Sequence, residues 1–546
     1  MLWMIAGAIA LAIGIIVWQD IKRKKETERY LRNSYGTVRA DMASRPDMLG
    51  NIEQLYLCEQ EEIPEGYRVD DITWDDLGMD TVFALADHTD SFAGEQYMYE
   101  RLHDLRADKE ELSGFEKMAR DFDGDAEKRF KVRKKLYSLG KRYIDYDVPV
   151  IIKAAGVLRV KNVKLYYVLA VLLVLSIVFA AVIHTAKALL LPVVIYVFNM
   201  TVHGIKKEKM DVNIKSMFGL GRLLNTAFAL KELIPEHSGD IGGDLEAMRG
   251  AAKKAAFLEM RSASDNGDPM SVLITYLLGP FMTDFIMYDR LVAEIEGKSG
   301  ECMRVYKYVG RLDCAIAAAS YRKSLRNCCV PEFTGEDKFS FEGLVHPAIA
   351  GAVANDYTHE RNGLITGSNA SGKSTFIKSA AINLILGQTI HTCTAESAVI
   401  PCCGVITSMA VRDDVLSGES YYIREIKYLK RMVELCRGDR LLFLAIDEIL
   451  KGTNTRERIG ASKAILEYFA DKKCMLIVAT HDLELAKAFE GKYDNYYFSE
   501  VIGSEDVKFD YKLHRGISSS CNAIKLLRVI GFPEEIVAGA EKAAAE

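Results

Sequence analysis

The chain shows two different patterns of hydrophobic and polar residues, one after the other. Over residues 71–164 and 204–330, apolar residues recur every three or four positions, as in VFALADHTDSFAGEQYMYERLHDL, and this spacing predicts amphipathic helices. From residue 331 onward, short β-rich runs (GLITG, LLFLAID, MLIVAT and VKFDYKL) alternate with helical stretches. Such alternation is typical of an α/β layer with a mainly parallel sheet. We therefore expect an all-α region followed by an α/β domain over residues 331–546.

Uncharged apolar stretches interrupt this pattern. Residues 2–18 carry no charge and are followed at once by the cations of residues 22–25. Because the positive charge follows the apolar run, we interpret residues 1–20 as an uncleaved transmembrane anchor whose C-terminal side is cytoplasmic. A polar segment, residues 21–70, follows it and is expected to be a linker.

A second apolar block has lysines on both flanks, which predicts a transmembrane hairpin over residues 165–203 with cytoplasmic ends. It consists of two stretches, residues 165–183 and 188–202. A pair of buried core helices is the alternative. The length of the first stretch favours the membrane, whereas the second stretch fits both interpretations equally.

Composition limits the classes of function. The chain has 546 residues, enough for three or four domains at about 150 residues each. Its formal net charge of -6 argues against a globally basic nucleic-acid-binding protein and leaves only a local basic face open. Its eleven cysteines lack paired CxxC spacing, and the doublets at 328–329 and 402–403 are poorly spaced for zinc. We therefore expect reduced thiols, as in cytosolic proteins.

The run GSNASGKS fits the phosphate-binding pattern GxxxxGK[ST]. It follows the strand-like GLIT and precedes the helical STFIKSAAINLIL, which is the context that the motif requires. Glycines let backbone N–H groups face phosphate oxygens, and the next helix presents its positive dipole end to the same anion. We expect Lys373 to neutralise the β- and γ-phosphates and the Ser374 hydroxyl to bind Mg²⁺. The predicted nucleotide-binding residues of this loop are Gly367, Ser368, Asn369, Ala370, Ser371, Gly372, Lys373, Ser374 and Thr375.

Polar residues after two later strands complete a candidate site for ATP hydrolysis. LLFLAID ends in Asp447, expected to bind the metal, and Glu448 follows as the candidate general base. His481 follows MLIVAT, where it can hydrogen-bond the γ-phosphate or the attacking water; a purely structural histidine is the alternative. Between the loop and the acids, LSGES looks like an ABC signature, which implies that Ser420 contacts the γ-phosphate of a partner subunit. The order of these motifs indicates a dimer that sandwiches ATP.

Several segments together resemble the MutS family, in that family's order. ITGSNASGKST is similar to TGPNMGGKST, DEILKGTNT to DEIGRGTST, and SGESYYIRE to SGRSTFMVE. HPAIAGAVANDY resembles the family's approach to the P-loop, which implies that Asn355 belongs to the nucleotide site. LADHT with Gly94 resembles the segment that opens the family's helical core. Leu312 with Asp313 resembles the segment at which the family's chain returns to that core. The resemblance implies a helical core in two halves, residues 71–164 and 204–330, and an ABC-type ATPase domain over residues 331–546.

The chain also departs from that family. Residues 1–70 contain no mismatch-recognition domain with a Phe-x-Glu wedge, and the apolar hairpin stands where the family has a DNA clamp. Glu457 and Arg458 replace the usual Asp-Gly, Leu450 replaces a glycine, and Lys451 replaces an arginine. The resemblance therefore gives good support for ATPase function and poor support for mismatch repair.

We expect a membrane-anchored MutS-like ATPase that uses Mg²⁺ and acts as an ATP-dependent homodimer switch. It would be a multi-pass protein of the cell membrane with its ATPase domain in the cytoplasm. Binding of double-stranded DNA stays open, supported by the resemblance and by the basic clusters at 128–135 and 206–209. An ABC transporter-type membrane ATPase is the alternative. Two features argue against it: the chain has only three predicted spans, and its helical core motifs are foreign to transporters. A nucleotide-binding scaffold without turnover is opposed by the intact Lys373, Asp447, Glu448 and His481.

Overall fold

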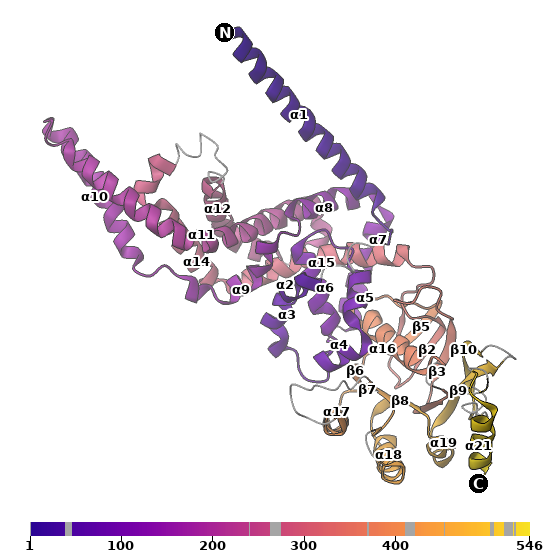
Figure 1. The fold of residues 1–546 in the computed structure, drawn as a ribbon. Coiled ribbons are helices and arrows are strands. Elements are labelled where there is room, and N and C mark those ends of the chain that lie inside the picture. The colour runs from indigo at the N-terminus through magenta and orange to yellow at the C-terminus, as the bar shows by residue number, and fades with distance from the viewer. Residues whose placement is uncertain are drawn as a thin grey trace.

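The chain forms an elongated helical body followed by an α/β domain (Figure 1). The computed structural model describes residues 2–38, 46–106, 108–239, 241–262, 275–368, 371–409, 421–451, 454–502, 507–517, 528 and 531–545. The helices before the first strand are α1 (Leu2–Asn33), α2 (Leu49–Ile52), α3 (Gln54–Glu59), α4 (Asp71–Leu77), α5 (Met79–Ala86), α6 (Phe92–His103), α7 (Lys109–Gly124), α8 (Ala126–Leu139), α9 (Val148–Lys153), α10 (Val163–Ile183), α11 (Leu190–Leu233), α12 (Ile241–Ser262), α14 (Thr283–Gly297) and α15 (Ser299–Ser324).

Side-chain caps mark where several helices of the body begin. Asp70, Ser91, Asp108 and Asp125 each accept a hydrogen bond from a backbone N–H in the first turn of α4, α6, α7 and α8. Such a cap satisfies a donor that has no partner within the helix and contributes ~1 kcal/mol. Local sequence therefore sets the starts of these helices.

Helices α6 and α15 cross closely although they lie far apart in the sequence. A Cβ on Gly94 of α6 would stand 2.2 Å from Oδ2 of Asp313 in α15. The Asp313 carboxyl is fully buried and accepts hydrogen bonds from the N–H groups of Asp90 and Ser91 at 3.0 and 2.8 Å. The two segments that the sequence singled out as the opening and return of the helical core thus meet at this crossing.

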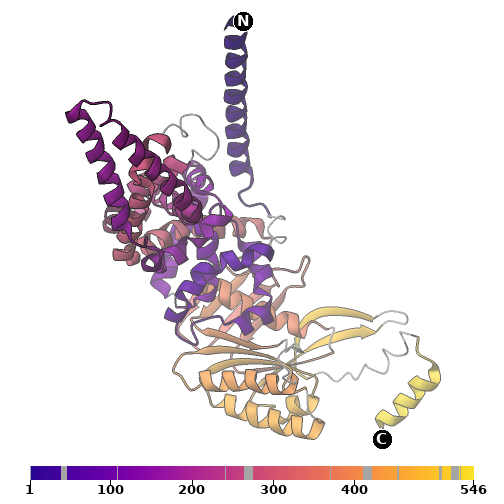
Figure 2. The same ribbon diagram turned by 60° about the vertical axis from the view of Figure 1, so that its left-hand side comes forward.

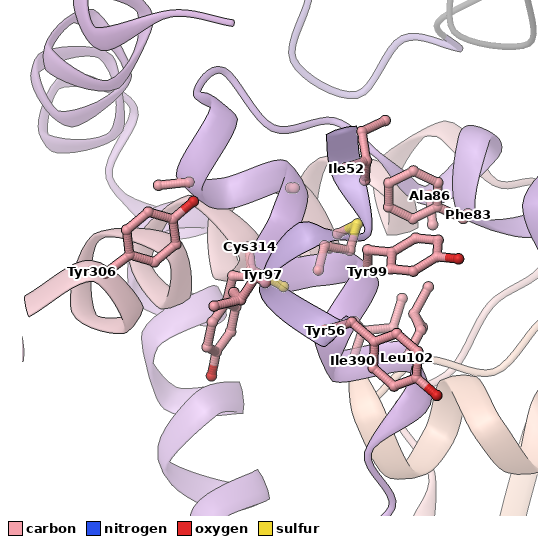
Figure 3. Packing of buried hydrophobic residues seen from close by; sticks show 14 of the residues in the cluster. Ile52, Tyr56, Phe83, Ala86, Tyr97, Tyr99, Leu102, Tyr306, Cys314 and Ile390 are labelled. Atoms are coloured by element: carbon pink, nitrogen blue, oxygen red, sulfur yellow. The ribbon is translucent and has the colours of Figure 1, made fainter. Parts of the chain in front are cut away.

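One hydrophobic core continues from the body into the α/β domain. Tyr56, Phe83 and Tyr99 of α3, α5 and α6 belong to a large buried cluster (Figure 3). The same cluster includes Ile390, which follows the first helix of the α/β domain. Because burial of such side chains stabilises by about 1.5–3 kcal/mol each, the two parts are held together by their shared core.

The α/β domain contains two sheets. Its strands are β1 (Glu332–Thr334), β2 (Phe339–Leu344), β3 (Asn355–His359), β4 (Gly363–Thr366), β5 (Ser397–Pro401), β6 (Gly404–Ser408), β7 (Leu442–Asp447), β8 (Cys474–Thr480), β9 (Asp494–Ile502) and β10 (Val507–Arg515). Its helices are α16 (Lys373–Thr389), α17 (Tyr421–Leu435), α18 (Thr455–Ala470), α19 (Leu483–Ala488) and α21 (Glu534–Ala545).

The larger sheet has the strand order β10-β9-β4-β8-β7-β6, parallel except for the antiparallel pair of β9 and β10. The four runs predicted as strands are β4, β7, β8 and β10, so the α/β expectation is confirmed. The smaller sheet, β1-β5-β2-β3, was not predicted, because its short strands mix polar and apolar residues. Residues that follow β4, β7 and β8 meet at one edge of the larger sheet, since these strands are parallel neighbours.

Two helical features project from the body, α1 and a hairpin of α10 with the first part of α11 (Figures 1 and 2). Among the described residues, α10 alone is long and apolar enough to cross a bilayer. The predicted second stretch, residues 188–202, lies mainly in the first part of α11, a helix of 44 residues that continues into the body. The side chains of residues 1–10 lie outside the described part of the chain. Of the three predicted spans, the structure therefore supports one apolar helix, and a multi-pass arrangement is not supported.

Part of the segment expected to be a linker, residues 21–70, packs into the body. Helix α1 extends beyond the predicted anchor, and Arg133 of α8 donates hydrogen bonds to the carbonyl of Leu31 and to Oγ of Ser34. Leu55 of α3 is fully buried in the core. In α3 the polar Glu59 is buried and the apolar Leu57 is 43% exposed, so the buried side of this helix was hard to recognise from composition.

Candidate nucleotide site

The loop after β4 contains two glycines in the left-handed region. Gly367 and Gly372 have φ angles of 143° and 106°, which side chains other than glycine rarely adopt. A Cβ on Gly367 would lie 2.9 Å from the carbonyl oxygen of Phe498. Gly372 leads into α16, whose first N–H groups have no helical partner and can bind an anion. Asn369 and Ala370, predicted to belong to this loop, lie outside the described residues.

Lys373 is folded onto its own loop. Its Nζ donates to the carbonyl oxygens of Gly367 and Ser368, both at 2.7 Å, and the residue is 3% exposed. Ser371 Oγ donates to the same Ser368 carbonyl at 2.7 Å. Because an ammonium group binds anionic oxygens more strongly than carbonyls, phosphate oxygens in this loop would compete for Lys373.

A hydroxyl and a carboxylate meet at the start of α16. Ser374 Oγ donates to Oδ2 of Asp447 at 2.6 Å. Asp447 is the last residue of β7 and pairs in register with Ala479 of β8. The contact brings together the two residues that the sequence predicted as metal ligands. Hard oxygen donors of this kind are the ligands that Mg²⁺ prefers.

The Glu448 carboxylate lies between the side chains of His481 and Lys451. Its Oε1 is 2.8 Å from Nε2 of His481, and its Oε2 is 3.1 Å from Nζ of Lys451. Burial raises the pKa of this carboxyl, but the hydrogen bonds from His481 and Lys451 outweigh burial and lower the pKa to about 2. Glu448 is therefore ionised at neutral pH and able to accept a proton. Its backbone has a φ of 66°, and its N–H donates to the carbonyl of Ala479 at 2.9 Å.

The α/β domain that holds this site matches a known protein-family model. Residues 363–546 match the family model described as MutS domain V. This part of the chain is a MutS domain V. MutS domain V is an ABC-type ATPase, so the chain carries an ATP-hydrolysing domain.

Curated relatives match this MutS domain V and residues before it. The DNA mismatch repair protein MutS of Pseudothermotoga lettingae is 27% identical over 263 residues, which cover 46% of this chain and 32% of that protein. The same-named protein of Clostridium kluyveri is 29% identical over 274 residues, 46% of this chain and 31% of that protein. That of Petrotoga mobilis is 33% identical over 184 residues, 32% of this chain and 22% of that protein. The chain thus spans about a third or less of the length of these relatives.

A cavity of about 370 Å³ lies beside the phosphate loop of the MutS domain V. It reaches Gly372 and Thr375, and its walls include both apolar side chains and the ring of His346. Pockets with mostly apolar walls and a few polar groups are typical of sites for small ligands. The other lining residues are Leu344, Ile349, Gly351, Ala352, Val353, Asn355, Phe376, Ser379, Phe498 and Tyr511.

Asn355 lines this cavity but uses its amide to hold β10. Its Nδ2 donates to the Tyr511 carbonyl at 3.0 Å, and its Oδ1 accepts from the N–H of Leu513 at 2.8 Å. Phe498 and Tyr511 also line the cavity, and neither was predicted to do so. Phe498 lies on β9, which pairs beside β4, and Tyr511 lies on β10 where the register with β9 shifts, so only the sheet topology could have indicated their positions.

Ser420 lies outside the described residues, so its predicted contact with a partner subunit stays a prediction. The helix that follows it, α17, contains Glu425, which accepts a hydrogen bond from the N–H of Lys451 at 2.9 Å. Helix α17 is therefore bonded to the loop that holds Glu448. Nothing in the spacing of the sequence suggested this link.

Proposed function

We propose that this chain binds ATP in the loop of residues 367–375 and hydrolyses it with Glu448 as general base. The contact between Ser374 and Asp447, beside a base that is already ionised, carries this proposal. Lys373 would exchange its two loop carbonyls for phosphate oxygens. His481 would hold the Glu448 carboxylate in place through the bond at 2.8 Å.

A magnesium ion fits the residues present. The hydroxyl of Ser374 and the carboxylate of Asp447 offer two oxygen donors 2.6 Å apart, next to the phosphate loop. When bound with ATP, the ion would neutralise charge on the phosphates. The chain's own part is to orient these oxygens and to keep Glu448 ionised.

We also propose that two copies act together as an ATP-dependent switch. The support is the order of the motifs and the signature-like run ending in Ser420, whose family counterpart acts across a dimer. The dimer would form only while ATP is bound at both sites. Sedimentation of the Glu448→Gln variant with and without ATP tests this, and a mass that does not change with ATP contradicts it.

Membrane attachment through the α10–α11 hairpin is the second part of the proposal. Large apolar side chains of α10 are about half exposed, among them Val171 at 53%, Leu175 at 58% and Phe179 at 48%. An exposed apolar surface of this length needs a cover, and a bilayer core about 30 Å thick matches the roughly 31 Å of a 21-residue helix. Replacing Val171 and Leu175 by aspartate should release the chain from a membrane fraction. Retention of that variant in the membrane would contradict the role of α10.

DNA binding is a candidate only through the relatives, which are named DNA mismatch repair proteins. Three cations of the basic run at 128–135 are engaged within the chain: Lys128 with Asp121 and Glu236, Arg133 with Asp90, and Lys134 with Glu28. These pairs leave less positive charge for phosphates than the sequence suggested. A filter-binding titration with duplex DNA over a salt series decides the matter, since phosphate contacts give affinities that fall steeply with salt.

The central experiment compares the wild-type chain with Glu448→Gln. The variant should keep its affinity for ATP and lose turnover by about 10²–10⁴-fold, the usual contribution of a general base. Glu467→Gln is the matched control, because this carboxylate pairs with Lys492 on the surface of the same domain. Unchanged turnover in Glu448→Gln would refute the assigned base. Turnover stimulated by a solute in liposomes would instead favour the transporter alternative.

A further inference from the structure

Helix α16 connects the phosphate loop to the helical body. It has 17 residues and is therefore about 25 Å long. Its first turn carries Lys373 and Ser374, and its other end lies at Thr389, which is fully buried. A rigid helix of this kind carries a displacement at one end to the other end, so what holds its far end decides where that displacement goes.

Two arginines of the body bind the C-terminal end of α16. Arg101 of α6 donates through Nε to the carbonyl of Thr389. Arg322, in the last turn of α15, donates through Nη2 to the carbonyls of Ile390 and His391 at 3.1 and 3.0 Å. The last carbonyls of a helix have no partner within it and carry partial negative charge, so cations are favourable there.

The body fixes the orientation of both arginines. Arg322 pairs through Nη2 with Glu116 of α7 at 2.7 Å, and Arg101 pairs through Nη1 with Glu111 at 2.8 Å. Glu116 is 5% exposed, and Arg101 is 7% exposed. The side chain of Ile390 is also part of the core cluster that contains α6 residues (Figure 3). The end of α16 is therefore held by charge-assisted bonds and by packing.

We infer that Arg101 and Arg322 are positioning residues that couple nucleotide occupancy at the start of α16 to the helical body. The inference rests on the proposed binding of ATP in the loop of residues 367–375. When ATP pulls Lys373 and Ser374 onto its phosphates, any shift of α16 moves the carbonyls that the two arginines hold. Helices α6 and α15, which cross at Gly94, then move with them as one unit.

Hydrogen exchange measured by mass spectrometry tests this coupling in the full-length chain. The Glu448→Gln background keeps ATP bound during the measurement. In that background, ATP should change the exchange both of the phosphate-loop peptides and of the peptides of α6 and α15. With Arg101→Ala and Arg322→Ala added, ATP should still protect the phosphate loop, and the response of α6 and α15 should be lost. Arg322→Lys should restore part of that response, since a lysine ammonium can still donate to the same carbonyls but lacks the planar fork of arginine.

Arg440→Ala is the matched control. Arg440 also joins the two parts, donating through Nη2 to the carbonyl of Leu105 at 2.8 Å and stacking on Tyr67, but it holds no carbonyl of α16. That variant should keep the full response of the body. A response of α6 and α15 that persists in the double variant at equal ATP occupancy overturns the coupling. Absence of protection at the phosphate loop in every variant, the background included, would instead refute ATP binding there, and the coupling with it.

Discussion

Replacing Gly94 by alanine tests the crossing of α6 and α15 that organises the helical body. The new Cβ would stand 2.2 Å from Oδ2 and 2.5 Å from Cγ of Asp313, against a comfortable separation of about 3.5 Å. To accommodate it, α15 must move by more than about 1 Å, and Asp313 must give up its bonds to Asp90 and Ser91. Overpacking costs about 1–3 kcal/mol, and each lost hydrogen bond adds ~1 kcal/mol. Alanine recovers about 1 kcal/mol through its helix propensity, so we expect a net loss of about 2–4 kcal/mol.

The assay is denaturant unfolding of the purified chain, followed by circular dichroism. Gly114→Ala is the control, because Gly114 also lies within a helix of the body and its Cβ would find only Arg311 Nη2, at 3.6 Å. The control should be neutral or up to ~1 kcal/mol more stable than the wild type. A Gly94→Ala chain that unfolds at the same denaturant concentration as the control would refute the close packing at this crossing.

Three further predictions concern the site and the body. Removing the bond from His481 by His481→Ala leaves burial to raise the pKa of Glu448 above its present value of about 2, so turnover should fall at mildly acidic pH where the wild type still works; superimposable pH–rate profiles would contradict this. Asn355→Ala frees β10 from the cavity wall, and the KM for ATP should rise about tenfold with little change in kcat, as expected for a lost hydrogen bond worth ~1.4 kcal/mol. Arg133→Met leaves Asp90 buried without its cation, and thermal unfolding should report a loss of about 3–5 kcal/mol; an unaltered melting temperature would count against it.

Much of the geometry of the candidate site could be predicted because its motifs are local in sequence. The motif around Lys373 fixes a turn and a helix start, and acids that end an apolar run must appear at the edge of a parallel sheet. The same reasoning could not find Lys451 as a partner of Glu448, because their pairing depends on a left-handed backbone at Glu448. The family resemblance implied a place for Asn355 at the nucleotide site, without revealing that its amide is bonded to β10.

The helices of the body could be predicted from the sequence, whereas their contacts and the boundaries of the body could not. Spacing of apolar residues gave helices, and the segments around Asp90 and Asp313 were singled out, but their contact crosses more than 200 residues and no local rule implies it. Residues 21–70 looked like a linker because their composition is polar and mixed, with Pro46, Pro64 and several glycines. Apolar length and flanking positive charge predicted three membrane spans, whereas residues 188–202 mostly belong to a helix that continues into the protein core.

The central claim is that ATP is held by the loop of residues 367–375 and hydrolysed by the acids that follow β7. A structure of the Glu448→Gln chain with ATP and Mg²⁺ tests it most directly. The account predicts a triphosphate at the start of α16, contacted by Lys373, with the ion between Ser374 and Asp447. Nucleotide bound elsewhere, or an empty loop at saturating ATP, would contradict it.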